Sequence, residues 1–197
     1  MRSPQIVRST RYTRPMKKPS NTRYVAFLRG INVGGNKKVP MTELKKMMEK
    51  MGLTNVKTLL ASGNVVFDAG NESLAALKKK LEAQFEKTFG FTSSMIIRSV
   101  GQITELAEAD PFKGIKVTPD IRLYVTFLTE DAKKSALKIP YVSAGKEFRI
   151  LRASSTEVMS VLDVSVTGTI EVMGVLEKEF GKSITTRNWN TVQKLLL

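Results

Sequence analysis

The sequence contains neither cysteine nor histidine among its 197 residues. Without cysteine the chain can form no disulfide, no thiolate nucleophile and no sulfur-rich zinc site. Without histidine it lacks the commonest general base and the commonest transition-metal ligand, so Ser-His and Cys-His catalytic pairs are excluded. We therefore predict no metal site and no cofactor, and any catalysis would depend on carboxylates, lysine, tyrosine or hydroxyl groups.

Long apolar runs are also missing. Hydrophobic residues make up 42% of the chain and charged residues 25%, a composition typical of globular proteins. No segment approaches the roughly 20 consecutive apolar residues that span a bilayer. We expect a soluble, cytoplasmic protein without a membrane partner, and nothing in the sequence indicates its oligomeric state.

Positive charge is abundant, with a formal net charge of +14. Such a balance is typical of proteins that bind nucleic acids. Half of it, however, comes from seven Lys and Arg residues among the first 23, a stretch with three prolines and no acid. This composition predicts a disordered basic tail over residues 1–22. Met16 followed by two lysines resembles a translation start, so we expect that residues 1–15 do not belong to the native protein.

The remaining chain shows one pattern twice, which predicts two domains at 23–115 and 116–197. In the first, periodicity predicts a strand, a helix, two strands, a helix and a strand, at residues 24–31, 44–51, 55–60, 65–68, 73–90 and 93–98. A helix at 99–108 and a linker at 110–119 follow. The second domain repeats the order at 121–127, 130–137, 147–151, 157–162, 170–180 and 184–186, and a C-terminal helix ends the chain.

This order indicates an α+β protein with two tandem ferredoxin-like (βαββαβ) half-domains, each with an antiparallel sheet. The first strand of each half is apolar at odd and even positions, which is typical of strands covered on both faces. We therefore expect the two halves to cover one another. Clefts between domains are common ligand sites, so functional residues are expected on loops at this junction.

The first polar segment that stands out is the loop from residue 29 to residue 38. A glycine-rich loop between a strand and a helix can present N–H groups to a phosphate, and lysine adds charge. The spacing does not fit the P-loop or the dinucleotide-binding glycine motif. The glycines could equally serve backbone geometry alone. The candidate ligand-binding residues here are Arg29, Gly30, Asn32, Gly34, Gly35 and Lys37.

Two further segments supply candidates. Ser62, Gly63 and Asn64 could bind a ligand through hydroxyl and amide groups, although a turn or bulge needs the same residue types. The last segment surrounds the only tryptophan of the chain, and Arg and Trp together can hold a phosphate and stack on a base. Alternatively, an asparagine there caps the C-terminal helix, the tryptophan fills the junction and the arginine pairs with a carboxylate. The candidates are Arg187, Asn188, Trp189 and Asn190.

The strings RGINVGGNKKVPM, ASGNVVF and TTRNWNTV, in this order, resemble the signature of a bacterial family known as domain of unknown function 1697. The resemblance runs from about Tyr24 to the C-terminus. It implies a tandem ferredoxin-like fold and no known activity, so no catalytic residues can be transferred from the family.

The function that these features favour is the binding of a nucleotide, a nucleic acid or another phosphate-bearing ligand at the junction of the two halves. One alternative is a structural or protein-interaction role, in which the three segments build the joint between the halves. Another is an enzyme that acts on a small anionic substrate. The chain contains no RNA-binding string of exposed aromatics and no paired-carboxylate spacing, so neither RNA recognition nor a particular reaction is specified.

Overall fold

Two antiparallel sheets form the framework of the computed structural model, which describes residues 21–35, 37–70, 72–166 and 172–197. Residues 1–20 of the predicted tail (1–22) lie outside the described residues. Within the described part of the chain, no helix has the length and apolarity needed to cross a membrane.

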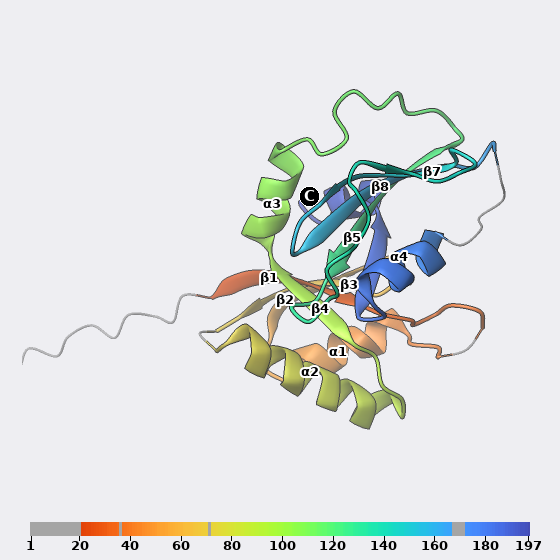
Figure 1. Ribbon diagram of the computed structural model, residues 1–197. Helices are drawn as coiled ribbons and strands as arrows, with labels where there is room; N and C mark the ends of the chain where they lie inside the picture. Colours follow the sequence, from red (N-terminus) through yellow and green to blue (C-terminus); the bar gives the residue numbers. More distant parts are fainter. Residues whose placement is uncertain (1–20, 36, 71, 167–171) are drawn as a thin grey trace, which may run out of the picture.

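The first half has the element order that the sequence predicts. It consists of β1 (Thr22–Leu28), α1 (Met41–Lys50), β2 (Thr54–Leu59), β3 (Asn64–Ala69), α2 (Leu74–Phe89) and β4 (Met95–Ser99). The strands pair in the order β2-β3-β1-β4. The two helices lie side by side on one face of this sheet (Figure 1), where Leu44 and Met47 of α1 and Leu77, Leu81 and Phe85 of α2 are buried against it.

The second half follows α3 (Val100–Glu108), whose capping box at Ser99 and Gln102 begins the helix as predicted. It consists of β5 (Ile121–Leu128), β6 (Tyr141–Val142), β7 (Phe148–Ala153), β8 (Glu157–Asp163), α4 (Val172–Phe180), β9 (Ile184–Asn188) and α5 (Trp189–Lys194). The sheet order is β6-β7-β8-β5-β9. The short strand β6 was not expected from the sequence.

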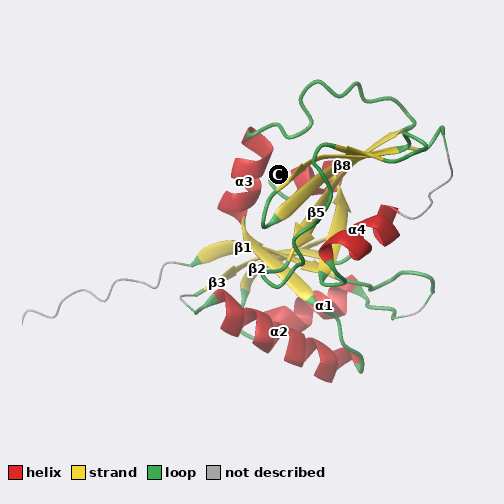
Figure 2. Ribbon diagram, viewed as in Figure 1, coloured by secondary structure: helices red, strands yellow, loops and turns green. Residues whose placement is uncertain are grey.

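The helix predicted at 130–137 is wrong. The structure has turns and irregular backbone between β5 and β6 (Figure 2). Ala132 and Leu137 are the residues of this segment that pack on the core, and five positions apart they do not share a helical face. The backbone N–H groups of this segment make hydrogen bonds outside a helical pattern. Lys133 N–H donates to the carbonyl of Phe180 at 3.0 Å, and Leu137 N–H donates to the hydroxyl of Ser135 at 3.1 Å.

The predicted helix at 170–180 begins at Val172 in the described residues. The sequence spacing of Ile170, Met173, Leu176 and Phe180 predicts one buried stripe, but Met173 is 40% exposed and Val172 is buried. Leu176 and Phe180 of the same helix are buried as predicted, and Val172, which lies four residues before Leu176, takes the place of Met173 on this face.

A shared core between the two sheets confirms that the halves cover one another. Val25 and Phe27 of β1 and Val125 and Phe127 of β5 are all fully buried in it. The rings of Phe27 and Phe127 stack with their centroids 4.2 Å apart and their planes 15° from parallel. The alternate residues of β1, Ala26 and Leu28, face the α1/α2 core instead. Burial on both faces therefore explains why the first strand has apolar residues at both odd and even positions.

The short helix α5 closes this shared core at the C-terminal end of the chain. Asn188 is its N-cap and accepts a hydrogen bond from Asn190 N–H at 3.0 Å, as one of the sequence alternatives proposed. Trp189 is 6% exposed and packs on Phe112, with ring centroids 5.5 Å apart. The tryptophan is thus part of the joint between the sheets.

We expect Trp189→Ala to lower the free energy of unfolding by about 3–5 kcal/mol, because it removes a large buried ring from the shared core. Equilibrium unfolding in urea measures this change. Val142→Ala, at a position 51% exposed, is the control and should stay within about 0.5 kcal/mol of wild type. Equal, small losses in both variants would contradict the packing role of Trp189.

Candidate functional site

Two of the three polar segments singled out in the sequence meet at one side chain, the guanidinium of Arg187 in β9, which also bonds to Leu28 just before the remaining segment. Its Nε donates to the side-chain oxygen of Asn64 at 2.6 Å, and one terminal nitrogen donates to the carbonyls of Leu28 at 2.6 Å and Ser62 at 3.1 Å. The other terminal nitrogen donates to the hydroxyl of Thr185 at 2.7 Å and the carbonyl of Thr186 at 2.9 Å. These bonds use all five N–H donors of the group.

Arg187 is a buried cation that has only neutral hydrogen-bond acceptors. The residue is 9% exposed, and no carboxylate lies within ion-pair distance of it among the described residues. Burial lowers the pKa of Arg187 to about 10, because desolvation disfavours the charged form. At neutral pH the group remains charged. The alternative in which Arg187 pairs with a carboxylate is therefore wrong.

Ser62, Gly63 and Asn64 hold the acceptors in place at the β2–β3 turn. Asn64 is fully buried, and its amide nitrogen donates to the carbonyl of Leu59 and the hydroxyl of Ser62, each at 3.0 Å. Gly63 has a φ of +76°, and a Cβ there would lie 2.8 Å from Ile31 Cδ1 and 2.9 Å from Leu28 Cβ. Both the backbone conformation and the close approach require glycine.

The loop after β1 is ordered by Asn32. Its amide nitrogen donates to the carbonyls of Val39 at 3.0 Å and Ala61 at 2.8 Å, and its amide oxygen accepts from Val39 N–H at 2.8 Å. Asn32 thus ties this loop to itself and to the β2–β3 turn. Gly34 and Gly35 are exposed with positive φ and serve the backbone turn, as the simpler interpretation of this loop proposed.

A cleft of about 950 Å³ opens beside Arg187 at the junction of the halves. Its walls come from the loop after β1, one side of α2, the segment before β4, and α4 and β9. The polar and charged side chains and the glycine that line it are Arg29, Gly30, Lys37, Lys79, Glu82, Glu86, Thr92, Ser93, Ser94, Glu177, Thr185, Thr186 and Arg187. Of the predicted candidates, Arg29, Gly30, Lys37 and Arg187 line this cleft.

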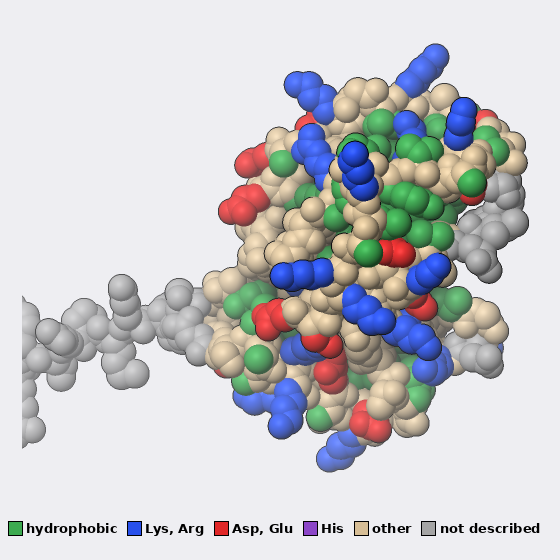
Figure 3. All heavy atoms as spheres, in the orientation of Figure 1, with side chains coloured by type: hydrophobic (Ala, Val, Ile, Leu, Met, Phe, Trp, Pro, Cys, Tyr) green, Lys and Arg blue, Asp and Glu red, His purple; other side chains and the backbone are tan. Residues whose placement is uncertain are grey.

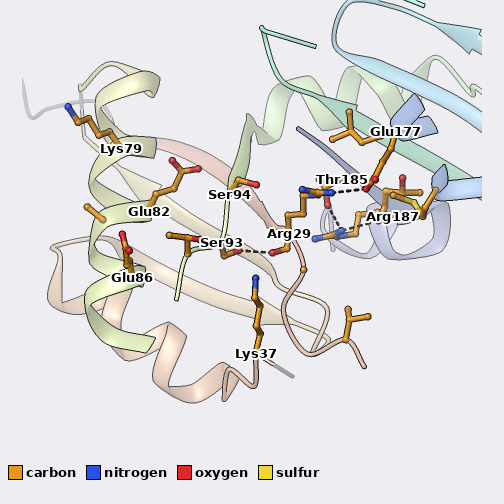
Figure 4. A pocket seen from close by; sticks show the side chains of 17 residues that line it. Arg29, Lys37, Lys79, Glu82, Glu86, Ser93, Ser94, Glu177, Thr185 and Arg187 are labelled. Carbon is orange, nitrogen blue, oxygen red and sulfur yellow. Dashed lines mark hydrogen bonds and ion pairs between the residues drawn. The ribbon is translucent and has the colours of Figure 1, made fainter. Parts of the chain in front are cut away.

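The two ends of the cleft differ in charge. Arg29, Arg187 and Glu177 lie together at one end, and Lys79, Glu82 and Glu86 of α2 form the opposite wall, with Ser93 and Ser94 between them (Figure 4). A terminal nitrogen of Arg29 donates to Glu177 Oε1 at 2.7 Å, and the two side chains are 36% and 30% exposed. The carbonyl of Arg29 accepts from the hydroxyl of Ser93 at 2.8 Å.

The other candidates lie outside this cleft. Trp189 is in the core between the sheets, Asn188 caps α5, and Asn190 is exposed beside a separate small cavity. The sequence did not single out Glu82, Glu86 or Glu177. In the sequence, these three glutamates are marked only by their position on a helix away from its buried face. Many other solvent-exposed residues have the same kind of position. No group of three Asp or Glu residues suited to a metal ion occurs in the described ranges.

Arg98 of β4 occupies the matching position on the other side of the joint. Arg98 is the β-partner of Val25, as Arg187 is of Val125. A terminal nitrogen of Arg98 donates to the carbonyl of Leu128 at 2.6 Å, and its Nε donates to Glu157 at 3.1 Å. Glu157 pairs with Phe127 in the sheet just as Asn64 pairs with Phe27. Arg98 therefore has a carboxylate where Arg187 has a neutral amide.

We expect Arg187→Met to lower the free energy of unfolding by about 2–4 kcal/mol, because several buried acceptors lose their donor at once. Arg152→Met, at an exposed position of β7, should change it by no more than about 0.5 kcal/mol. Urea unfolding of both variants tests this. A loss no larger for Arg187→Met than for Arg152→Met would mean that the Arg187 bonds do not hold the halves together.

The comparisons with known proteins give a family and a fold. The family model described as "Protein of unknown function (DUF1697)" matches residues 21–150. Among solved structures, conserved bacterial protein SP0830 from Streptococcus pneumoniae is similar with a TM-score of 0.61 and 24% sequence identity, over 89% of this chain and 97% of that one. At this identity the likeness shows the fold alone. No curated protein matches the chain significantly. Because the family match covers more than half of the sequence and includes two of the three polar segments, this chain belongs to the DUF1697 family.

Proposed function

We propose that this protein binds a small phosphate-bearing ligand in the cleft between its halves. The observation that carries the proposal is the buried, charged guanidinium of Arg187 at the cleft wall, bonded only to neutral acceptors. A positive charge in a low-dielectric surrounding without a counter-ion attracts an anion strongly. A phosphate in the cleft would supply that counter-ion.

Arg187 acts through its charge, because its five donors are already used. The direct contacts to the phosphate come from Arg29 and Lys37, which are partly or fully exposed on the loop after β1. The carboxylate of Glu177 now lies 2.7 Å from Arg29, the kind of position that a phosphate oxygen takes beside an arginine. The ligand phosphate replaces Glu177 at Arg29 when it binds.

The charge distribution favours a small ligand over a nucleic acid. Three glutamates line the cleft together with its basic residues, and they would repel the repeated phosphates of a polynucleotide. On the face drawn in Figure 3, Lys and Arg side chains are scattered over both halves with acidic side chains among them. A nucleic-acid track would need a continuous basic strip.

A structural role is the second candidate. It is supported by the full set of hydrogen bonds that Arg187 makes across the joint and by the burial of Trp189. In this account the three segments exist to lock the sheets together, and the cleft is incidental. The two accounts differ in whether anions bind, since the joint alone provides no reason for them to do so.

We also propose that both halves, 23–115 and 116–197, are ferredoxin-like βαββαβ units related by duplication, the second without its first helix. The matching strand orders β2-β3-β1-β4 and β7-β8-β5-β9 support this. So do the matching positions of Phe27 and Phe127, and of Arg98 and Arg187. The proposed ligand site then lies at one of two equivalent places, the one that has Asn64 where the other has Glu157.

We expect inorganic phosphate or pyrophosphate at millimolar concentration to raise the unfolding temperature of the protein by about 2 °C or more, because a ligand that binds only the folded state stabilises it. Arg29→Ala should abolish this shift. Arg152→Ala, which removes the same charge outside the cleft, should retain it. Thermal unfolding with sulfate and chloride as comparison salts measures the effect, and a flat response in wild type would favour the structural account.

A further inference from the structure

The cleft wall opposite the arginines carries two carboxylates, Glu82 and Glu86, and one lysine, Lys79. Glu82 and Glu86 are one helical turn apart on α2, and both line the cleft (Figure 4). Glu82 Oε1 accepts from Met95 N–H at 2.8 Å and lies 3.9 Å from the ammonium of Lys78, which leaves Oε2 for a ligand. For Glu86, no hydrogen bond or ion pair to another described side chain is found. A carboxylate only accepts hydrogen bonds, so this wall suits a ligand that brings hydroxyl or amine donors.

Hydroxyl groups lie between this wall and the arginines. Thr92 and Ser94 are exposed and line the cleft, whereas the hydroxyl of Ser93 is buried and committed to the carbonyl of Arg29. A serine or threonine hydroxyl can donate and accept. The middle of the cleft therefore fits a neutral, hydroxyl-bearing part of a ligand.

Stacking surfaces for a base are missing from the lining. The apolar residues of the described lining are Val33, Ala83, Met173 and Ile184, and none of its residues is aromatic. The ring of Phe91 lies beneath the ammonium of Lys37, 5.7 Å from the ring centroid, and Phe91 does not line the cleft. Proteins commonly hold nucleobases by stacking them on aromatic rings or arginine planes. Arg187 is buried and Arg29 is paired with Glu177, so neither offers an open plane.

The ion pair between Arg29 and Glu177 restricts the anion further. A ligand must displace the carboxylate from Arg29 to bind there. A terminal phosphate monoester carries a charge of about −1.5 to −2 at pH 7 and competes better with a carboxylate than a phosphodiester, which carries a single charge. The arginine end of the cleft therefore prefers a terminal phosphate.

We infer that the ligand is a phosphate monoester of a hydroxyl-rich aliphatic compound, a sugar phosphate or polyol phosphate. Its phosphate contacts Arg29 and Lys37 beside the charge of Arg187, and its hydroxyls lie at Glu82, Glu86 and Ser94. This inference rests on the proposed function. The cleft volume of about 950 Å³ lies within the range of pockets that hold small ligands. A nucleotide would leave its base against a wall that offers no stacking surface.

Isothermal titration of the full chain with ribose 5-phosphate, glucose 6-phosphate, glycerol 3-phosphate, AMP, ribose and inorganic phosphate tests this. We expect at least one of the first three to bind about tenfold tighter than inorganic phosphate, since hydrogen bonds to charged groups contribute this much. AMP, which adds a base to ribose phosphate, should bind no tighter than ribose 5-phosphate. Ribose without phosphate should not bind measurably.

Glu86→Gln separates the two ends of the cleft. It keeps the side-chain size and removes the carboxylate, so the preference for the hydroxylated phosphate over inorganic phosphate should fall about fivefold or more, while inorganic phosphate binds at least as well. Glu105→Gln, on the exposed surface of α3, makes the same change in net charge and should keep the preference.

The outcomes distinguish the inference from the proposed function. Tighter binding of AMP than of ribose 5-phosphate would overturn the inference. Equal binding of inorganic phosphate and all three hydroxylated phosphates would also overturn it. So would a Glu86→Gln variant that still prefers the hydroxylated phosphate over inorganic phosphate. In each case phosphate still binds and the proposed function stands. No heat of binding for any phosphate by the wild-type protein would overturn both.

Discussion

The burial of one positive charge, that of Arg187, is the constraint on which the joint between the halves depends. Removing a charged group from water costs several kcal/mol, and only a full set of hydrogen bonds makes this burial tolerable. The acceptors come from Leu28, from the Ser62–Asn64 turn and from β9 itself. Segments more than 100 residues apart in the sequence must therefore place their acceptors within hydrogen-bond distance of the Arg187 guanidinium. Gly63 lies between two of these acceptors, and a Cβ there would strike Leu28 and Ile31.

The comparison with Arg98 gives the physical reason for proposing a site on one side of the joint only. Both arginines reach across to the backbone of the opposite half and lie over a phenylalanine of the stacked pair, with 5.6 Å from Arg187 to the ring of Phe27 and 6.0 Å from Arg98 to the ring of Phe127. Glu157 neutralises Arg98 at 3.1 Å. Asn64 accepts from Arg187 without neutralising it. One difference in side-chain charge between equivalent positions thus leaves a net positive charge beside the larger cleft.

Features with local or periodic causes could be predicted from the sequence. The doubly apolar pattern of β1 and β5 predicted burial on both faces, and the three polar strings marked the segments that meet at the joint. The sequence could not show that Arg187 bonds to carbonyls of Leu28 and Ser62, because backbone acceptors have no residue identity. It also failed at 130–137, where good helix-forming residues lack a common apolar face and bond instead to the end of α4. Glu82, Glu86 and Glu177 were missed because a glutamate on an exposed helix face looks the same whether it borders a cleft or open water.

The most direct test of the central claim is the phosphate affinity of Asn64→Asp. This substitution keeps the shape of the side chain and places a carboxylate 2.6 Å from Nε of Arg187, where the amide oxygen now lies, and the hydroxyl of Ser62 can turn to donate to it. Because the buried charge then has its own counter-ion, we predict that the folded variant, checked by circular dichroism, loses about tenfold or more in phosphate affinity. Affinity equal to that of wild type would show that the uncompensated charge of Arg187 does not create the site.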